Sequence, residues 1–123
     1  MSLSLQIALV LIGLLHTPPA ISGLSKSKLA ALYKIDINDS VLLVLLHHRA
    51  VLFALLAGAC YYSAFTQQFA GEVSVAAYIA MLSFVGIAFS IPHNSPAIKK
   101  IAIADAIGAV VLTAGWAIHG MGN

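Results

Sequence analysis

Residues 41–65 read VLLVLLHHRAVLFALLAGACYYSAF, an apolar run with a single polar interruption. At 1.5 Å per residue, a helix of this length measures about 38 Å, enough to cross a hydrocarbon layer about 30 Å thick. The interruption is the triplet His47-His48-Arg49. A charged side chain at membrane depth costs roughly 3 kcal/mol or more, so the triplet is expected to have partners or a function.

The composition places the chain in the class of integral membrane proteins. Of its 123 residues, 61% are hydrophobic and 8% are charged, with a mean hydropathy of +1.00, whereas about a quarter of the residues of a soluble domain are charged. At about 20 residues per span, this length accommodates four spans in one domain. The net charge of +2 is too small to indicate nucleic-acid binding. The single cysteine, Cys60, has no cysteine with which to form a disulfide.

Four apolar runs are long enough to form spanning helices, so the chain is predicted to be an all-α, four-helix transmembrane bundle. The expected spans are residues 3–21, 41–65, 73–91 and 97–118. Pro18 and Pro19 are expected to kink or end the first span because neither has an N–H group to donate. Asp39 and Ser95 are residue types that cap helices, which places the starts of the second and fourth spans.

The first apolar run has the length of a signal peptide but the reverse charge order. No Lys or Arg precedes its apolar core, and three lysines follow it, so it is expected to remain as a span. After it, Lys26 and Lys28 alternate with Leu29 and Leu32 at helical spacing. This pattern predicts a short interfacial helix between spans one and two.

The basic residues gather on one side of the predicted bundle. All six lie in or beside the first and third connections between spans: Lys26, Lys28, Lys34, Arg49, Lys99 and Lys100. Cytoplasmic loops of membrane proteins carry an excess of Lys and Arg. Both connections are therefore expected in the cytoplasm and both termini outside.

This orientation brings five ionisable residues to a similar depth in the cytoplasmic half. They are predicted to form a buried substrate-binding or proton-relay site: Arg49, Asp105, His48, His47 and His16. Asp105 is the only acid inside a span and Arg49 is the only arginine, so an ion pair between them is the natural hypothesis. Alternatively, such a pair has only the structural role of holding span two against span four. A further alternative is that Arg49 extends to lipid phosphates.

The three polar residues of span two cannot all face the interior of the bundle. Successive helical residues turn by about 100°, so His47 and Arg49 point roughly 200° apart. One member of the triplet is therefore expected to face lipid, the interface or a partner subunit. The helical faces alone do not choose which one.

Histidine has three readings in this setting. As a haem or metal ligand, His16 would act with His47 or His48, although no HxxxH or CxxCH spacing supports ligation. As a proton carrier, histidine would use its change of charge near neutral pH beside Asp105. As a structural residue it would only be hydrogen-bonded. No cofactor, metal site or catalytic residue is predicted.

Span four carries a stripe with polar ends. Asp105, Gly108, Leu112, Trp116 and His119 follow one another at helical spacing. One face of this helix would then line a path between the two membrane surfaces. The alternative for its outer end is that Trp116 and His119 are an ordinary interfacial anchor.

Small residues recur at four-residue spacing on the last three spans, which predicts close helix packing within the bundle or between two copies of it. The pairs are Ala54 with Gly58, Ala76 with Ala80, Gly86 with Ser90, and Ala104 with Gly108. Their spacing does not separate the two kinds of packing.

The segments His48-Arg49-Ala50-Val51-Leu52-Phe53 and Ala104-Asp105, together with Leu32-Tyr33, Asp39 and the His16-to-Pro18 kink, carry a resemblance. In them the chain resembles a group of small, uncharacterised proteobacterial inner-membrane proteins and, more loosely, the four-helix DoxX-like families. The resemblance implies four helices, a multi-pass protein of the bacterial inner membrane, and attention to His48, Arg49 and Asp105. It implies no particular activity.

Three functional hypotheses follow from these patterns. The first is a non-enzymatic membrane protein, namely a small transporter, channel or proton-coupled accessory subunit, surrounded by the lipid bilayer and expected as a homodimer. The second is a redox or lipid-handling enzyme whose histidines bind haem, metal or a lipid head group. The third is a structural subunit of a larger membrane complex.

Overall fold

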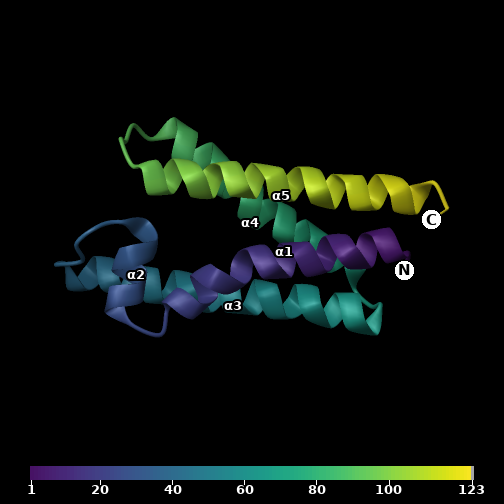
Figure 1. Cartoon of the computed structure of the whole chain (residues 1–123), viewed down its shortest axis with the longest axis horizontal. Helices are drawn as coiled ribbons and strands as arrows, with labels where there is room; N and C mark the ends of the chain where they lie inside the picture. The colour runs from purple at the N-terminus through teal and green to yellow at the C-terminus, as the bar shows by residue number, and fades with distance from the viewer. Residues whose placement is uncertain (123) are drawn as a thin grey trace.

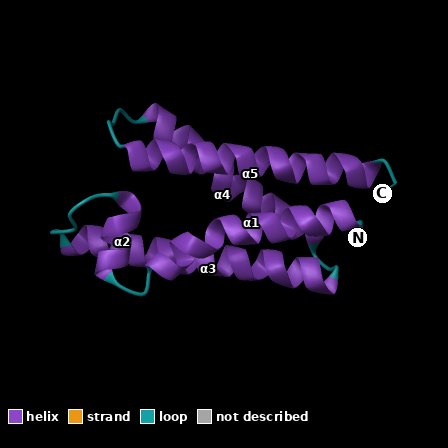
Figure 2. Ribbon diagram, viewed as in Figure 1, coloured by secondary structure: helices purple, strands orange, loops and turns teal. Residues whose placement is uncertain are grey.

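The computed structural model describes residues 1–122, which form five helices and no strand (Figure 2). The helices are α1 (Leu3–Ser22), α2 (Lys26–Tyr33), α3 (Ser40–Thr66), α4 (Ala70–Ser90) and α5 (Pro96–Gly120). All except α2 are long and apolar enough to cross a membrane, as in a multi-pass membrane protein. The all-helical fold and the four long apolar helices are confirmed, and the largest shift in a boundary is the start of α4, three residues earlier than expected.

Local side-chain chemistry accounts for where these helices begin. The carboxylate of Asp39 accepts the backbone N–H of Val41 at 2.9 Å at the start of α3. The hydroxyl of Ser95 accepts the backbone N–H of Ile98 at 3.2 Å, directly before Pro96 in α5. Each cap satisfies an N–H group that has no partner within its helix.

The first span continues past its two prolines, in agreement with the expected range of residues 3–21. Helix α1 continues through Pro18 and Pro19 to Ser22, and Gly23 caps it. Only the two hydrogen bonds that the proline nitrogens would have donated are lost. Membrane helices tolerate this loss because neighbouring groups satisfy the freed carbonyls.

The helices form two closely packed pairs that diverge toward one end. Helix α1 packs most extensively on α3, α5 packs to a similar extent on α1 and on α4, and α3 meets α4 much less. In Figure 1, α4 starts near the end of α3 and rises away from it toward the start of α5. The two pairs are therefore close at one end of the molecule and apart at the other.

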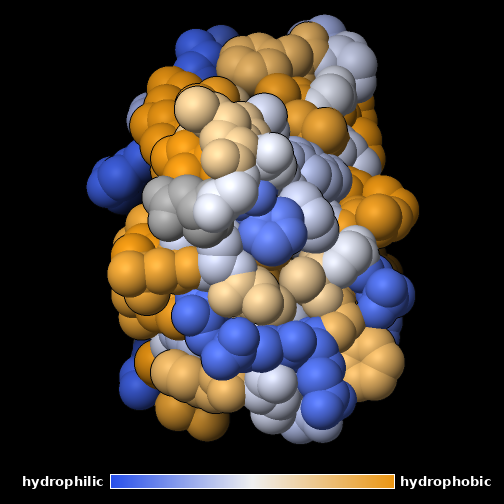
Figure 3. All heavy atoms as spheres, turned by 90° about the vertical axis from the view of Figure 1, so that its right-hand side faces the viewer, coloured by the Kyte–Doolittle hydropathy of each residue, from blue (hydrophilic) through white to orange (hydrophobic). Residues whose placement is uncertain are grey.

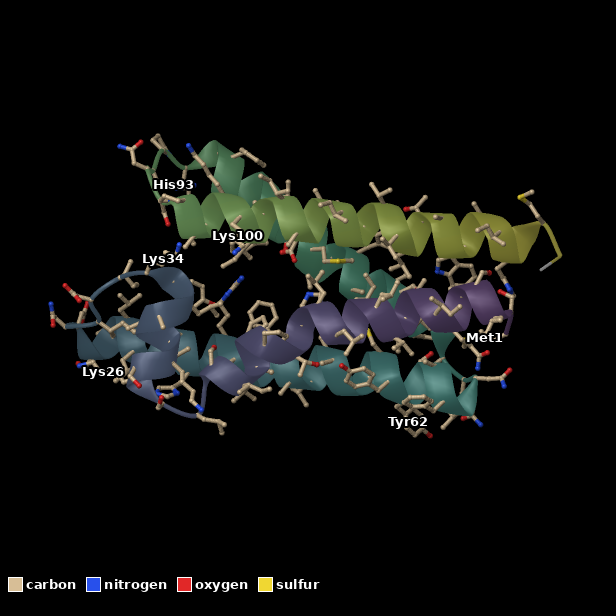
Figure 4. The ribbon with its side chains drawn as sticks, viewed as in Figure 1. Met1, Lys26, Lys34, Tyr62, His93 and Lys100 are labelled. Atoms are coloured by element: carbon tan, nitrogen blue, oxygen red, sulfur yellow. The ribbon has the colours of Figure 1, made fainter. Side chains whose placement is uncertain are left out.

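The two ends of the molecule differ in chemistry. Both termini and the α3–α4 connection lie at what we call the terminal end, which Figure 3 shows as a polar centre with apolar flanks. Helix α2 and the α4–α5 connection lie at the other end. Figure 4 shows Lys26, Lys34 and Lys100 there, so we call it the basic end.

The tightly packed core fills the terminal half of the molecule. Leu9, Cys60, Met81 and Leu112, one from each long helix, are completely buried there. A second, smaller cluster of Leu29, Tyr33 and Ile37 holds α2 and its following turn in place at the basic end. Packing is thus dense where the pairs meet, which leaves room for a cavity where they diverge.

The small-residue pattern is only partly realised in packing. Gly108 lies against the side chains of Leu15 and Met81, whereas Gly58 and Gly86 have open space where a Cβ atom would be. The close approaches not foreseen from the sequence are those of Gly13, Gly23 and Gly115 to neighbouring helices. None of these three glycines belongs to the pairs that the four-residue spacing picked out.

Candidate functional site

A cavity of about 520 Å³ opens at the basic end among α1, α2, α3 and α5. Its wall is mainly apolar, and four polar side chains line it: His16, Lys34, Lys100 and Asp105. Figure 4 shows the two lysines on the α2 and α5 sides of this region. A largely apolar pocket of this size with a few convergent polar groups is the usual form of a small-molecule site.

His16 forms the buried polar end of the cavity. Its side chain is 2% exposed, and its ring stacks in a tilted arrangement on Phe53, with 5.5 Å between ring centroids. The Nδ1–H donates to the carbonyl oxygen of Ile12 at 2.8 Å, one turn earlier in α1. This bond leaves Nε2 as an acceptor, and Nε2 is buried without a hydrogen-bond partner among residues 1–122.

Asp105 reaches the same cavity from α5. Its side chain is 5% exposed, and it makes no hydrogen bond with any residue of the described chain. A buried carboxylate without a partner is strongly disfavoured at membrane depth. His16 and Asp105 therefore present two unsatisfied hydrogen-bonding groups to one cavity.

Arg49 does not form the expected ion pair with Asp105, since no salt bridge joins any two side chains in residues 1–122. Its Nε–H donates to the hydroxyl of Tyr33 at 2.9 Å, and its guanidinium lies 4.5 Å from the Phe53 ring centroid and 4.6 Å from that of Phe84. Cation–π contacts of this kind stabilise a guanidinium in apolar surroundings. The side chain lines a separate groove between α3 and α4.

The two histidines of the triplet lie outside the cavity. The Nδ1–H of His47 donates to the carbonyl oxygen of Gly23 at 3.1 Å, which ties α3 to the end of α1. His48 is exposed on the outer surface of α3. The expectation that one member of the triplet faces outward agrees with this placement, and the outward residue is His48.

The path predicted along α5 is filled in this structure. Leu112 is completely buried in the core, and Gly108 is covered by Leu15 and Met81. At the outer end of the stripe, Trp116 donates to the Ser74 hydroxyl at 2.9 Å. The stripe is therefore a packing seam between helices, and the cavity is closed toward the terminal end.

The predicted site thus divides into three parts. His16 and Asp105 share the cavity, Arg49 lies in the neighbouring groove, and the other two histidines belong to neither. In the sequence, Lys34 and Lys100 indicated only the orientation of the chain in the membrane, and their place at the cavity was not predicted. Phe53 forms the wall between the cavity and the groove. The only signal for it in the sequence is its position four residues after Arg49.

No group of three or more His, Cys, Asp or Glu side chains within residues 1–122 is arranged to hold a metal ion. In comparisons with known proteins, no family model, no curated protein and no solved structure matches the chain. The resemblance to DoxX-like proteins therefore stays a prediction.

Proposed function

We propose that this protein is a small multi-pass membrane protein that binds a small amphiphilic molecule in the cavity at its basic end. The observation that carries the proposal is the buried Nε2 of His16, which has no hydrogen-bond partner in the described chain and shares a cavity of about 520 Å³ with Asp105. A bound molecule with a hydrogen-bond donor would satisfy both groups.

The charges along the cavity indicate what kind of molecule fits. At the buried end, the Nε2 of His16 and the carboxylate of Asp105 are acceptors, which suit a hydroxyl or ammonium group. At the mouth, Lys34 and Lys100 suit an acidic group, and the wall between the two ends is apolar. The ligand is therefore an apolar chain or ring system with a donor group at one end and an acid at the other.

Among the candidate functions, a transporter or proton-coupled accessory subunit fits such a binding site better than a channel does. The packed Leu112 closes the cavity on one side, so a transported molecule would leave only after α5 separates from α1. His16 would accept a proton from the ligand or from water as the molecule moves. We also propose that the protein assembles as a homodimer or within a larger membrane complex.

The haem or metal alternative has less support. His16 offers one free ring nitrogen, but a second axial ligand from the triplet is missing, because His47 is bonded to Gly23 and His48 faces outward. Binding of a lipid head group by Lys34 and Lys100 remains compatible with the cavity. In that case the amphiphile itself is a lipid.

Ligand binding is tested with amphiphiles of matched length. We expect 10-hydroxydecanoic acid to bind the detergent-solubilised protein about tenfold more tightly than decanoic acid, because only the former can donate to the buried acceptors. His16→Leu should abolish this difference, measured by isothermal titration calorimetry. Val110→Ala, an exposed change on α5, is the control. Equal affinities of the two acids for the wild-type protein would reject the proposed site.

We also propose that the basic end faces the cytoplasm of a bacterial inner membrane, with both termini outside, because all five lysines lie at or near that end. In a Cys60→Ala background, a cysteine at Gln68 should react with a membrane-impermeant maleimide applied to intact cells. A cysteine at Ser27 should react only after permeabilisation. Both positions are exposed in the structure, so the reverse labelling pattern would mean the opposite orientation.

A further inference from the structure

The groove between α3 and α4 is a second concave site, separate from the cavity. It measures about 450 Å³, and apart from Phe53 none of the residues that line it lines the cavity. Its wall consists of apolar and small residues with one cation, Arg49. The wall includes Leu52, Leu56 and Ala59 on α3 and Ala76, Ala80 and Ser83 on α4.

Arg49 is held at this groove by three aromatic residues. Tyr33 accepts its Nε–H, and Phe53 and Phe84 lie against the guanidinium. The terminal nitrogens make no hydrogen bond with any part of the described chain, residues 1–122. Because a guanidinium offers five N–H donors in a planar fork that matches phosphate oxygens, most of its donors remain available to a ligand.

The depth of Arg49 is compatible with a lipid head group. Helix α3 has 27 residues and is about 40 Å long, roughly 10 Å more than the hydrocarbon layer. Arg49 is about 14 Å from the start of the helix, and its Nε–H is bonded to Tyr33 of α2, a helix that lies at the basic end. Long basic side chains extend toward head groups, and the bilayer thins locally around them.

The shape of the groove also suits a phospholipid. Helices α3 and α4 meet near the terminal end and diverge toward the basic end (Figure 1). The groove between them follows α3 from Arg49 toward Ala59 and follows α4 along Ala76, Ala80 and Ser83. An apolar groove with a cation at its head-group end has the chemistry of a phospholipid, with acyl chain along the groove and phosphate at the guanidinium.

We propose that this groove binds an anionic phospholipid of the surrounding bilayer, with its phosphate on Arg49 and an acyl chain between α3 and α4. The proposal does not depend on the cavity or on its ligand. It assigns Arg49 a lipid phosphate as its counter-ion in place of Asp105. It also explains why Arg49 is retained at a surface that faces lipid, although a charged side chain there costs free energy.

The test is native mass spectrometry of the purified protein titrated with phosphatidylglycerol or phosphatidylcholine of identical acyl chains. For the wild type, the first phosphatidylglycerol is expected to bind about tenfold more tightly than phosphatidylcholine, as for a charge-assisted contact. Arg49→Gln should remove this preference. Lys99→Gln, which removes an exposed lysine outside the groove, should keep it.

A second pair of variants tests the groove without touching Arg49. Ala80→Phe places a ring in the groove and should weaken binding of both lipids, whereas Ile79→Phe, an exposed neighbour on α4, should change neither. Circular dichroism checks that each variant keeps its helix content. Three results would overturn the proposal: equal affinity of the wild type for the two lipids, displacement of the lipid by millimolar inorganic phosphate, or a dimer that occupies the groove with a second copy of the chain.

Discussion

Gly115→Leu is expected to lower the free energy of unfolding by about 2–3 kcal/mol, as overpacking of a close helix contact does. A Cβ atom at this position in α5 would lie 2.6 Å from the Cβ of Ala8 and 3.4 Å from the backbone oxygen of Ser4. Neither atom belongs to a flexible side chain, so α1 and α5 would have to separate. This contact closes the terminal half of the bundle, so the loss is expected to be large.

The measurement is equilibrium unfolding in mixed micelles, followed by the helical circular dichroism signal. Gly120→Leu is the matched control, because it lies on the same helix with nothing within 4 Å of the new Cβ and should change stability by about 0.5 kcal/mol or less. If the two variants are equally stable, the close packing of α1 on α5 does not hold in the purified protein.

Asp105→Leu is expected to change stability in the opposite direction, raising the free energy of unfolding by about 2 kcal/mol. The carboxylate is buried and unpaired in the described chain, and an acid in the middle of a spanning helix costs about 3 kcal/mol relative to leucine. The adjacent cavity offers room for the larger side chain. The same variant should lose the preference for 10-hydroxydecanoic acid, because an acceptor is removed.

If Asp105→Leu raises stability and weakens ligand binding, Asp105 is retained for function, since functional sites often contain strained or unsatisfied groups. Ala106→Leu, the exposed neighbour of Asp105 on α5, is the control and should be nearly neutral. If Asp105→Leu instead destabilises the protein, the carboxylate has a structural role. The equilibrium unfolding measurement separates the two.

Much of the helical framework could be predicted from local chemistry. Long apolar runs define spanning helices because a helix satisfies all of its backbone hydrogen bonds within one segment. Asp39 and Ser95 mark helix starts because a side chain there replaces missing hydrogen bonds. Pro18 and Pro19 left open whether the first span bends or ends, since a proline removes one hydrogen bond without necessarily ending a helix that its surroundings support.

The candidate site was predicted only in part. His16 and Asp105 were both selected because polar residues stand out in an apolar chain, and the structure places them in one cavity. The pairing of Arg49 with Asp105 followed from charge alone. Its actual neighbours, Tyr33, Phe53 and Phe84, are ordinary residues of apolar helices, and nothing local marks them as partners of a cation.

The number of long helices, two of their capped starts and the few polar residues within them can be read from the amino-acid sequence alone, because these properties depend on neighbours along the chain. Which of the polar residues meet depends instead on how the helices pack. That choice depends on the divergence of the two helix pairs, which opens a cavity beside His16 and a groove beside Arg49, and it arises from contacts between residues far apart in sequence.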